Sequence, residues 1–418
     1  MSQLTDDCFA FGGKLMTTAE ALRLLGERVT TVVDVEEVPL AQACGRILAR
    51  DLGAERDQPP HDNAAVDGYA FRHRDLDPDG GTRLSVAGRA AAGHPYGDNL
   101  GAGQAVRIFT GAVMPPGSDT VIMQEDARLD GQVVIVPPGL KAGANRRRAG
   151  EDFKRGETIL STGRRLRAQD VGLAAAAGRD RLCLYRPLRV AVFSTGDELR
   201  EPGSELAPGA IYDANRHLLI ALLQGLHCTV GDLGILPDRA EAVRRALADA
   251  AGRFDLLVTS GGVSTGEEDH VRAAVEANGT LHFWRLAIKP GRPLALGQVR
   301  GTPFIGLPGN PVAVMVCFLR FARPLILKLG GAGELEPVFF QVPADFEHRK
   351  KQDRREWIRA RLAAGADGGR VARKFERQGS GIITSLSRSD GLVEIPEEVT
   401  YLARGTMVDF LPFNEVTM

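Results

Sequence analysis

The sequence predicts an α/β protein of several domains, and three observations lead to this fold class. The chain has 418 residues, which is more than one hydrophobic core usually serves. Residues 187–330 alternate short apolar runs with amphipathic segments, the pattern of a three-layer α/β/α domain with a mostly parallel sheet. The regions on either side carry short apolar runs broken by Gly and Pro, which favours β-rich structure. We therefore expect domains at residues 1–186, 187–330 and 331–418.

The N-terminal region is expected to combine helices with a β-rich subdomain. Thr17 and Glu20 have the spacing of a capping box, and an apolar face follows them, so a helix begins there. A second, short helix is expected over residues 40–49, and an Ala-rich helix over residues 168–177. An insert over about residues 81–166 alternates apolar residues with turn formers, and it is therefore expected to form strands.

The middle region is expected to alternate strands with helices. Its apolar runs predict strands at residues 189–195, 229–236, 255–259 and 281–286. Helices are expected after Asp213, which can cap one, and at residues 240–251, 268–278 and 312–329. Because ligands of such sheets bind beyond the carboxyl ends of the strands, the loops that follow these strands are the candidate site.

The C-terminal region is expected to form a small β-barrel of about eighty residues, which lies within the usual size range of a domain. A glycine-rich segment, residues 330–333, separates it from the preceding helix. Its clearest strand patterns are at residues 338–342, 356–361, 391–395 and 407–411.

The composition argues against several classes of function. Lys and Arg number 52 and Asp and Glu number 53, so the net charge of -1 gives no general attraction to nucleic acid or to an anionic membrane. The five cysteines form no C-x-x-C pair, which argues against a structural zinc site or a disulfide framework. No apolar stretch reaches membrane-spanning length and no secretory leader is recognisable, so we expect a cytoplasmic protein.

A glycine-rich turn is the most informative local feature of the chain. It follows the strand expected at residues 255–259, and Gly261 and Gly262 permit a tight bend. Such a turn can direct backbone amides and the hydroxyl of Ser264 at an anion. Carboxylates follow at residues 267–269, and a divalent cation would join them to a phosphate or an oxyanion. The alternative is that the glycines serve packing alone.

Three further loops are expected at the same edge of the sheet. The first strand leads into Asp197 and Glu198, although Asp197 can equally cap a helix. Lys289 and Arg292 stand among rigid Pro and Gly residues, so they face a phosphate or else form a charged surface turn. Residues 307–311 form a turn rich in Pro and Gly that would bring the backbone close to a ligand.

Polar residues also gather in three loops of the N-terminal region, at residues 59–70, 107–111 and 146–152. Each loop alone has the composition of a solvated surface loop. Together they suggest a second polar wall for the ligand-binding cleft that is expected at the edge of the α/β sheet.

These segments together resemble the molybdopterin molybdenumtransferases, or MoeA family, which is related to the C-terminal part of gephyrin. The resemblance extends over nearly the whole chain. The matching segments are Asp62–Ala70, Phe109–Ala112, Arg147–Asp152, Phe193–Leu199, Ser260–Gly266 with Asp269, Lys289–Gly291 and Leu307–Pro311.

The resemblance implies a transferase that takes molybdate and adenylylated molybdopterin, inserts molybdenum and releases AMP. It also implies a requirement for Mg²⁺ and a homodimer with a shared active cleft, to which a molybdopterin adenylyltransferase could deliver the adenylate. An adenylyltransferase is itself one alternative, but that family would match residues 187–330 alone. A scaffold role like that of gephyrin is the other.

The resemblance also assigns roles to individual residues. It implies catalytic roles for Asp67, Thr110, Glu198, Asp269 and Lys289. Glu198 and Asp269 are the implied metal ligands, and which carboxylate binds metal and which acts as a base stays open. The expected substrate-binding residues, some of which belong to the glycine-rich turns, are Gly261, Gly262, Ser264, Asp238, Pro308, Asp152, Arg354 and Ser380.

Overall fold

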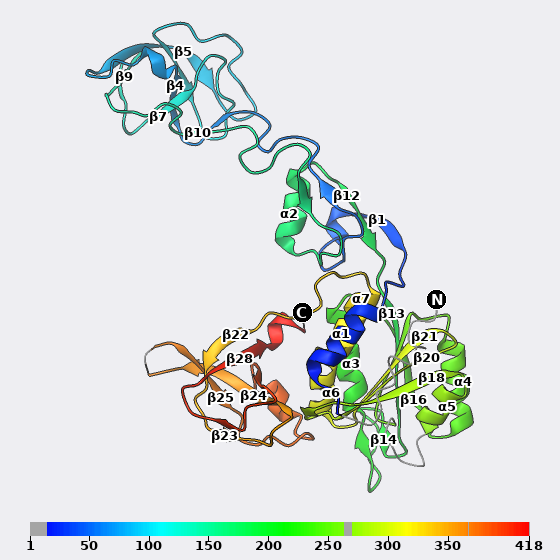
Figure 1. Cartoon of the computed structure of the whole chain (residues 1–418). Coiled ribbons are helices and arrows are strands. Elements are labelled where there is room, and N and C mark those ends of the chain that lie inside the picture. Colours follow the sequence, from blue (N-terminus) through cyan, green and yellow to red (C-terminus); the bar gives the residue numbers. More distant parts are fainter. Residues whose placement is uncertain (1–14, 263–269, 367, 418) are drawn as a thin grey trace. The chain divides into compact units, whose positions relative to one another are not determined.

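The computed structural model describes residues 15–262, 270–366 and 368–417, and the chain divides into two compact units (Figure 1). We call Asp51–Ser161 with Ala168–Arg181 the inserted unit. The main unit consists of Met1–Arg50, Thr162–Arg167 and Leu182–Met418, so far as these residues are described. Within the described residues, no helix is long and apolar enough to cross a membrane.

The inserted unit is built around a six-stranded sheet with the strand order β7-β4-β6-β5-β9-β8. This agrees with the β-rich structure expected from its alternating sequence. The sheet strands are β4 (Gly68–Phe71), β5 (Thr82–Ala90), β6 (Gln104–Ile108), β7 (Thr120–Met123), β8 (Arg128–Asp130) and β9 (Val133–Val136). Short pairs join β2 (Leu52–Gly53) to β11 (Thr158–Leu160) and β3 (Asn63–Ala64) to β10 (Arg146–Arg147), and the helix is α2 (Ala168–Ala176).

The main unit contains a second six-stranded sheet, and its strand directions decide where the site lies. Its order is β16 (Thr229–Leu236), β13 (Arg189–Thr195), β17 (Leu256–Ser260), β21 (Thr302–Leu307), β20 (Pro293–Val299) and β18 (Gly279–Arg285). The pairs from β16 to β21 are parallel, whereas β20 is antiparallel to both β21 and β18. β18 therefore runs in the same direction as β21, and the loops after β13, β17, β18 and β21 all leave the same edge of the sheet.

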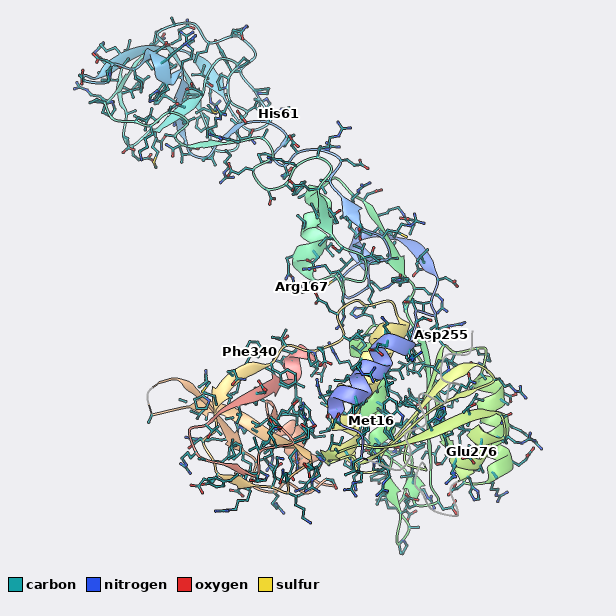
Figure 2. All side chains as sticks on the ribbon, viewed as in Figure 1. Met16, His61, Arg167, Asp255, Glu276 and Phe340 are labelled. Atoms are coloured by element: carbon teal, nitrogen blue, oxygen red, sulfur yellow. The ribbon has the colours of Figure 1, made fainter. Side chains whose placement is uncertain are left out.

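Helices cover both faces of this sheet, as a three-layer domain requires (Figure 1). One face carries α4 (Ala240–Ala250) and α5 (His270–Glu276), which pack on Phe193 and Leu257. The other face carries α1 (Thr18–Arg28), α3 (Ala214–Gly225), α6 (Pro311–Cys317) and α7 (Arg323–Leu329). The capping box of α1 is present, and Met16 before it is fully buried and pairs with Leu286 (Figure 2).

The helices expected at residues 40–49 and 312–329 differ in the structure. At the first position the chain forms a 3-10 turn, η2 (Leu40–Gln42), because Gly45 takes a left-handed φ of +81°. At the second position a π-helical turn, η4 (Phe318–Ala322), separates α6 from α7. Pro324 follows at once and has no N–H to donate to the carbonyl of Arg320, so the regular α-helical bonding is interrupted there.

The sequence pattern does not predict strands β20 and β21, which the structure contains. They form a tight hairpin in which Arg300 and Gly301 both have positive φ, 48° and 84°. Asn-Gly and Asp-Gly are the common signals of such a turn, and Arg-Gly is not. The hairpin also reverses the chain between β18 and β21, which a simple alternation of strand and helix does not anticipate.

The C-terminal part of the main unit forms a third six-stranded sheet. It contains β19 (Ile288–Lys289), β22 (Phe340–Pro343), β24 (Arg355–Ala364), β25 (Arg370–Lys374), β26 (Gly391–Ile395) and β28 (Met407–Pro412), in the order β19-β24-β26-β28-β22 with β25 beside β24. The remaining elements are β23 (His348–Arg349), paired with β27 (Tyr401–Leu402), and α8 (Thr384–Ser387). The β-rich structure expected here is confirmed, and an exposed Phe340 begins β22 (Figure 2).

One strand of this third sheet comes from the α/β region. The edge strand β19 (Ile288–Lys289) lies between β18 and β20 in the sequence, yet it pairs in parallel with the start of β24. Ile288 is opposite Arg355 and Lys289 is opposite Glu356. The loop that leaves the α/β sheet is therefore hydrogen-bonded into the C-terminal sheet, which fixes the two against each other.

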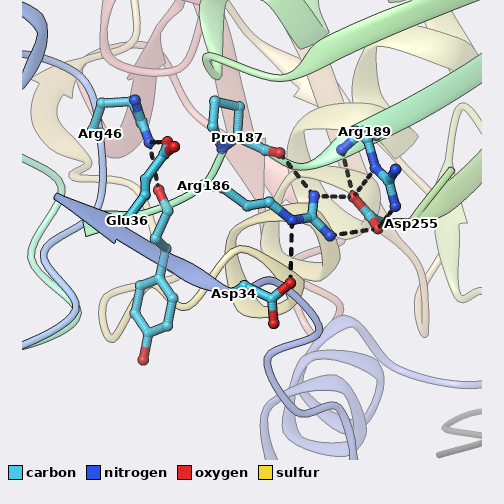
Figure 3. Close-up of polar contacts among 8 residues, drawn as sticks. Asp34, Glu36, Arg46, Arg186, Pro187, Arg189 and Asp255 are labelled. Atoms are coloured by element: carbon cyan, nitrogen blue, oxygen red, sulfur yellow. Dashed lines mark hydrogen bonds and ion pairs between the residues drawn. The ribbon is translucent and has the colours of Figure 1, made fainter. Parts of the chain in front are cut away.

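A carboxylate joins the N-terminal ends of β13 and β17, at the edge of the sheet away from the candidate site (Figure 3). Asp255, just before β17, accepts hydrogen bonds from Arg186 at 2.7 and 2.9 Å and from the backbone N–H of Arg189 at 2.8 Å. Burial alone would raise the pKa of Asp255, but the hydrogen bonds from the two arginines outweigh it and lower the pKa to about 2. Asp255 thus aligns two adjacent strands of the sheet, β13 and β17, whose other ends lead to candidate site residues.

The replacement Asp255→Asn is expected to destabilise the main unit by about 2 kcal/mol, between the values typical of exposed and buried ion pairs. Urea denaturation followed by tryptophan fluorescence measures this, since Trp284 and Trp357 both lie in the main unit. Because the pKa of Asp255 is lowered, its contribution is present above about pH 4 and is lost as the pH falls through about 2.

Asp34→Asn is the matched control, because Asp34 lies 3.9 Å from Arg186 but its side chain is 93% exposed. Its cost is expected to stay within about 0.5 kcal/mol. Equal effects of the two replacements would contradict the structural role given to Asp255.

Candidate functional site

A cavity of about 610 Å³ opens in the main unit between the α/β sheet and the C-terminal sheet. Its lining residues come from the turns after β17 and β21, from the β19 loop and from the C-terminal domain. The α/β region contributes Gly261, Gly262, Lys289, Pro290, Gly291, Arg292, Pro293, Pro308, Gly309, Asn310 and Ala313. The C-terminal domain contributes His348, Glu356, Trp357, Ile358, Arg359, Gln378, Gly379 and Ser380.

The glycine-rich turn forms one wall of the cavity, and its glycines are required by geometry. Gly261 and Gly262 both have positive φ, 81° and 62°. A Cβ atom at Gly262 would lie 2.6 Å from Oγ1 of Thr195 and 2.9 Å from Cγ2 of Val271. Another residue at this position would displace the turn from the end of β13, so the backbone of the wall depends on glycine.

Asn215, in the first turn of α3, ties this wall to the next turn. Its Nδ2 donates to Oγ of Ser260 at 2.8 Å and to the carbonyl oxygen of Gly309 at 2.7 Å. Oγ of Ser260 in turn donates to the carbonyl oxygen of Pro308 at 3.2 Å. The turns after β17 and β21 are therefore held at a fixed separation. No sequence motif singles out Asn215, and its position two residues after the helix cap Asp213 is the one signal that the sequence offers.

Lys289 reaches the cavity from the edge strand β19, and its side chain is about half exposed (51%). Its Nζ lies 3.5 Å from Oε1 of the buried Glu356. Nη2 of Arg354 donates to the same oxygen at 2.9 Å, and Nε2 of His348 lies 2.9 Å from Oε2. Burial would raise the pKa of Glu356, but the bond with His348 and the cations lower it to about 2. This carboxylate is therefore charged at neutral pH.

Ser380 lies in a turn that a buried arginine holds in place. Arg359 is 1% exposed, and its Nη2 donates to the carbonyl oxygen of Gly379 at 2.9 Å. Burial lowers the pKa of Arg359 to about 10. The carbonyl oxygen of Ser380 accepts from the backbone N–H of Val312 at 3.0 Å, which joins the turn to the start of α6. The family resemblance implies a role for Ser380 but not for Arg359, whose role depends on the folded turn.

The structure thus brings together five of the predicted site residues, Gly261, Gly262, Lys289, Pro308 and Ser380. Arg354 contacts the cavity wall through Glu356. Two others, Glu198 and Asp238, follow β13 and β16 at the same edge of the sheet but do not line the cavity. The other predicted site residues of this region, Ser264 and Asp269, lie outside the described residues.

Glu198 is exposed and its carboxylate folds back over Gly196. A Cβ atom at Gly196, where φ is 147°, would lie 2.6 Å from Oε2 of Glu198. Across residues 15–262, 270–366 and 368–417, no group of three or more His, Cys, Asp or Glu side chains is placed to hold a metal ion. Any cation bound by Glu198 would therefore need ligands beyond these described side chains, from other residues, from water or from a substrate.

Three of the predicted site residues, Asp67, Thr110 and Asp152, belong to the inserted unit. Oδ1 of Asp67 accepts from the backbone N–H of Thr110 at 2.7 Å and from its hydroxyl at 2.8 Å. These two bonds hold the pKa of Asp67 below its ordinary value. Asp152 lines a cavity of about 580 Å³, together with Gln58, Pro59, Asn63, Gly111, Arg147 and Glu151.

Comparison with known proteins gives matches along the whole chain. The MoeA N-terminal region (domain I and II) matches residues 16–178, a probable molybdopterin binding domain matches 191–328, and the MoeA C-terminal region (domain IV) matches 341–413. A molybdopterin molybdenumtransferase of Haemophilus influenzae is 38% identical over 404 residues, which cover 96% of this chain and 100% of the relative. The chain belongs to the MoeA family.

Further relatives agree with membership of the MoeA family. A molybdopterin molybdenumtransferase of Nostoc is 35% identical over 400 residues, covering 93% of this chain and 91% of the relative. A crystal structure of a molybdopterin biosynthesis MoeA protein from Pyrococcus horikoshii superimposes with a TM-score of 0.81 at 32% identity, covering 95% of this chain and 99% of that one. The resemblance and the multidomain fold class are confirmed. Since MoeA models also match both sides of residues 187–330, an adenylyltransferase is disfavoured.

The replacement Asn215→Ala is expected to loosen the glycine wall of this MoeA protein. Without the amide, Oγ of Ser260 and the carbonyl of Gly309 lose their shared donor, so the turns after β17 and β21 open more often. We expect amide hydrogen exchange of Gly261, which donates to Leu307, to become about tenfold faster.

Asn278→Ala is a suitable control, because the side-chain amide of Asn278 donates within its own helix region, to the carbonyl oxygen of Ala274 at 2.9 Å. It should leave exchange at Gly261 unchanged. An unaltered exchange rate in Asn215→Ala would show that the wall does not depend on this amide.

Proposed function

We propose that this protein is a molybdopterin molybdenumtransferase, which inserts molybdenum from molybdate into adenylylated molybdopterin and releases AMP. The proposal rests on the cavity between the α/β sheet and the C-terminal sheet, in which a glycine-rich turn at the carboxyl edge of the α/β sheet faces Lys289 and Ser380. A glycine-rich turn at such an edge can bind a phosphate group through its backbone N–H groups, and cations together with hydroxyls can bind an oxyanion. Of the two proposed substrates, adenylylated molybdopterin carries phosphate groups and molybdate is an oxyanion.

Lys289 is proposed to neutralise negative charge as the adenylate is cleaved. In that step a water oxygen attacks the adenylyl phosphorus and gives up a proton, the bond from that phosphorus to the oxygen it shares with the molybdopterin phosphate breaks, and AMP and the molybdopterin phosphate are the products. Positive charge fixed beside the phosphoryl oxygens is worth more in the transition state than in the ground state. The half-exposed side chain of Lys289 lies on the cavity wall, and Ser380 and the Pro308 turn would orient the second substrate.

Mg²⁺ is proposed as the metal, because the donors at the sheet edge are hard carboxylate oxygens. Mg²⁺ is commonly bound by one or two carboxylates together with water and substrate phosphates. Glu198, with its exposed carboxylate after β13, would hold it, and the sequence adds Asp269. When bound, the ion would supply charge neutralisation to the pyrophosphate group.

We also infer a cytoplasmic homodimer with a shared cleft. Asp67, Thr110 and Asp152 are the functional positions that the family resemblance assigns to the inserted unit. In the proposed dimer, the inserted unit of one subunit would supply Asp67 and Thr110 to the cleft of the other. A molybdopterin adenylyltransferase is the proposed source of the adenylate.

The direct test is release of AMP from adenylylated molybdopterin by the purified protein. AMP release is expected to depend on molybdate and on Mg²⁺. A protein that instead only forms the adenylate from ATP would contradict the proposal.

Lys289→Ala is expected to lower molybdate-dependent AMP release by about 10²- to 10³-fold, the usual effect of removing one group that stabilises transition-state charge. Lys289→Arg should restore part of the rate, because it keeps the charge but changes the hydrogen-bond geometry. The exposed Lys141 is the control, and Lys141→Ala should keep the full rate. A rate in Lys289→Ala close to that of the unmodified protein would remove this residue from the mechanism.

The shared cleft is tested by a heterodimer purified with two different tags, one subunit carrying Asp67→Ala and the other Lys289→Ala. Each homodimeric variant is expected to be inactive. If the cleft is shared, the heterodimer contains one intact site and recovers about half of the normal activity. If each site used one chain alone, the heterodimer would stay inactive.

A further inference from the structure

Glu356 is a buried carboxylate on the cavity wall, and the sequence patterns assign it no role. In β24, Arg355 pairs with Ile288, and the next residue, Glu356, pairs with Lys289. Glu356 therefore lies directly opposite Lys289. The residues next to it include Trp357 and Ile358, which also line the cavity. Glu356 is therefore a negative charge at the wall of a site proposed to bind anions.

The two oxygens of Glu356 have different neighbours. Oε2 lies 2.9 Å from Nε2 of His348. Oε1 accepts from Nη2 of Arg354 at 2.9 Å and lies 3.5 Å from Nζ of Lys289. The ammonium of one predicted site residue and the guanidinium of another thus converge on a single oxygen atom.

The segment that carries Arg354 is also held from behind. Nζ of Lys350 donates to the carbonyl oxygens of Arg354 at 2.7 Å and of Glu397 at 3.0 Å. Among the described residues, Glu356 is the carboxylate that the half-exposed side chain of Lys289 contacts, and no second support like that of Arg354 is found there. Since a free lysine side chain samples many rotamers, its contact with Glu356 restricts where its charge can lie.

Two effects of Glu356 on an anion oppose each other. Its charge repels the anion, although Lys289 and Arg354 together leave the group with a net positive charge. Its position, however, holds two donors together before the anion arrives, which reduces the entropy lost on binding. Placing a buried carboxylate beside an anion site makes sense if the second effect is larger.

We propose that Glu356 is a positioning residue that fixes Lys289 and Arg354 as a preformed pair for one tetrahedral oxyanion. The identification of that oxyanion as molybdate rests on the proposed function. Glu356 acts through the two cations and is not itself a catalytic residue. His348 fixes the second carboxylate oxygen and thereby the direction of the first.

The sign of a binding change tests this proposal. Glu356→Gln removes a negative charge, so electrostatics alone predicts tighter binding of molybdate. The proposal predicts the opposite, a Kd for sodium molybdate about tenfold higher, measured by calorimetry on the full-length protein. Tighter or unchanged binding overturns the proposal, as does a lack of molybdate binding by the unmodified protein.

Asp345→Asn is the control in the same domain. Asp345 pairs with Arg373 at 2.8 Å and does not line the cavity, so this variant should bind molybdate within about twofold of the unmodified protein. Glu356→Asp keeps the charge but shortens the side chain, and it also is expected to weaken binding. It decides the question if Glu356→Gln does not fold, and normal binding by it overturns the proposal.

AMP release by the same samples separates this proposal from the proposed function. Molybdate binding that weakens in Glu356→Gln, with no AMP release by the unmodified protein, would support the positioning role and contradict the transferase. AMP release together with tighter binding by Glu356→Gln would support the transferase and overturn the positioning role.

Discussion

The pairing of β19 with β24 is the interaction on which the candidate site depends. Ile288 and Lys289 leave the α/β sheet and become the edge of the C-terminal sheet, opposite Arg355 and Glu356. Backbone hydrogen bonds across this joint set the separation of two domains that could otherwise move as separate bodies. The cavity lies at that joint, so its shape is fixed by a strand pairing and not by loop contacts alone.

Charge at the joint is balanced locally. Lys289 and Arg354 both pair with Glu356. Arg355, the residue before Glu356, pairs instead with Glu394 and Glu397. Alternation along β24 sends these neighbouring side chains in opposite directions. The strand thus separates one set of ion pairs, which faces the cavity, from another, which secures the C-terminal sheet.

Much of the fold follows from the sequence, because local signals and the long-range structure agree. The capping box of α1, the strand ending in Ser260 and its glycines, and the β-rich terminal region are all found in the structure. The loops after β13, β17, β18 and β21 share one edge, as a mostly parallel sheet requires. Gly45 and Pro324 show where a local feature overrides an apolar helical pattern.

The missed residues owe their roles to contacts between distant segments. Glu356 gains its neighbours through register with β19, and Asn215 joins two turns that are far from it in the sequence. Arg359 is an unremarkable strand residue until the Gly379 turn folds over it. Motifs report residues that act near their own chain position, whereas such supporting contacts depend on the tertiary structure.

The position of bound molybdate decides whether the cavity is the site. Crystals of the full-length protein soaked in molybdate can be measured at the molybdenum absorption edge, where anomalous scattering locates the metal. We expect a peak in the cavity between the α/β and C-terminal sheets, within reach of Lys289 and Ser380. A peak found only in the inserted unit beside Arg147, with the cavity empty at saturating molybdate, would contradict this expectation.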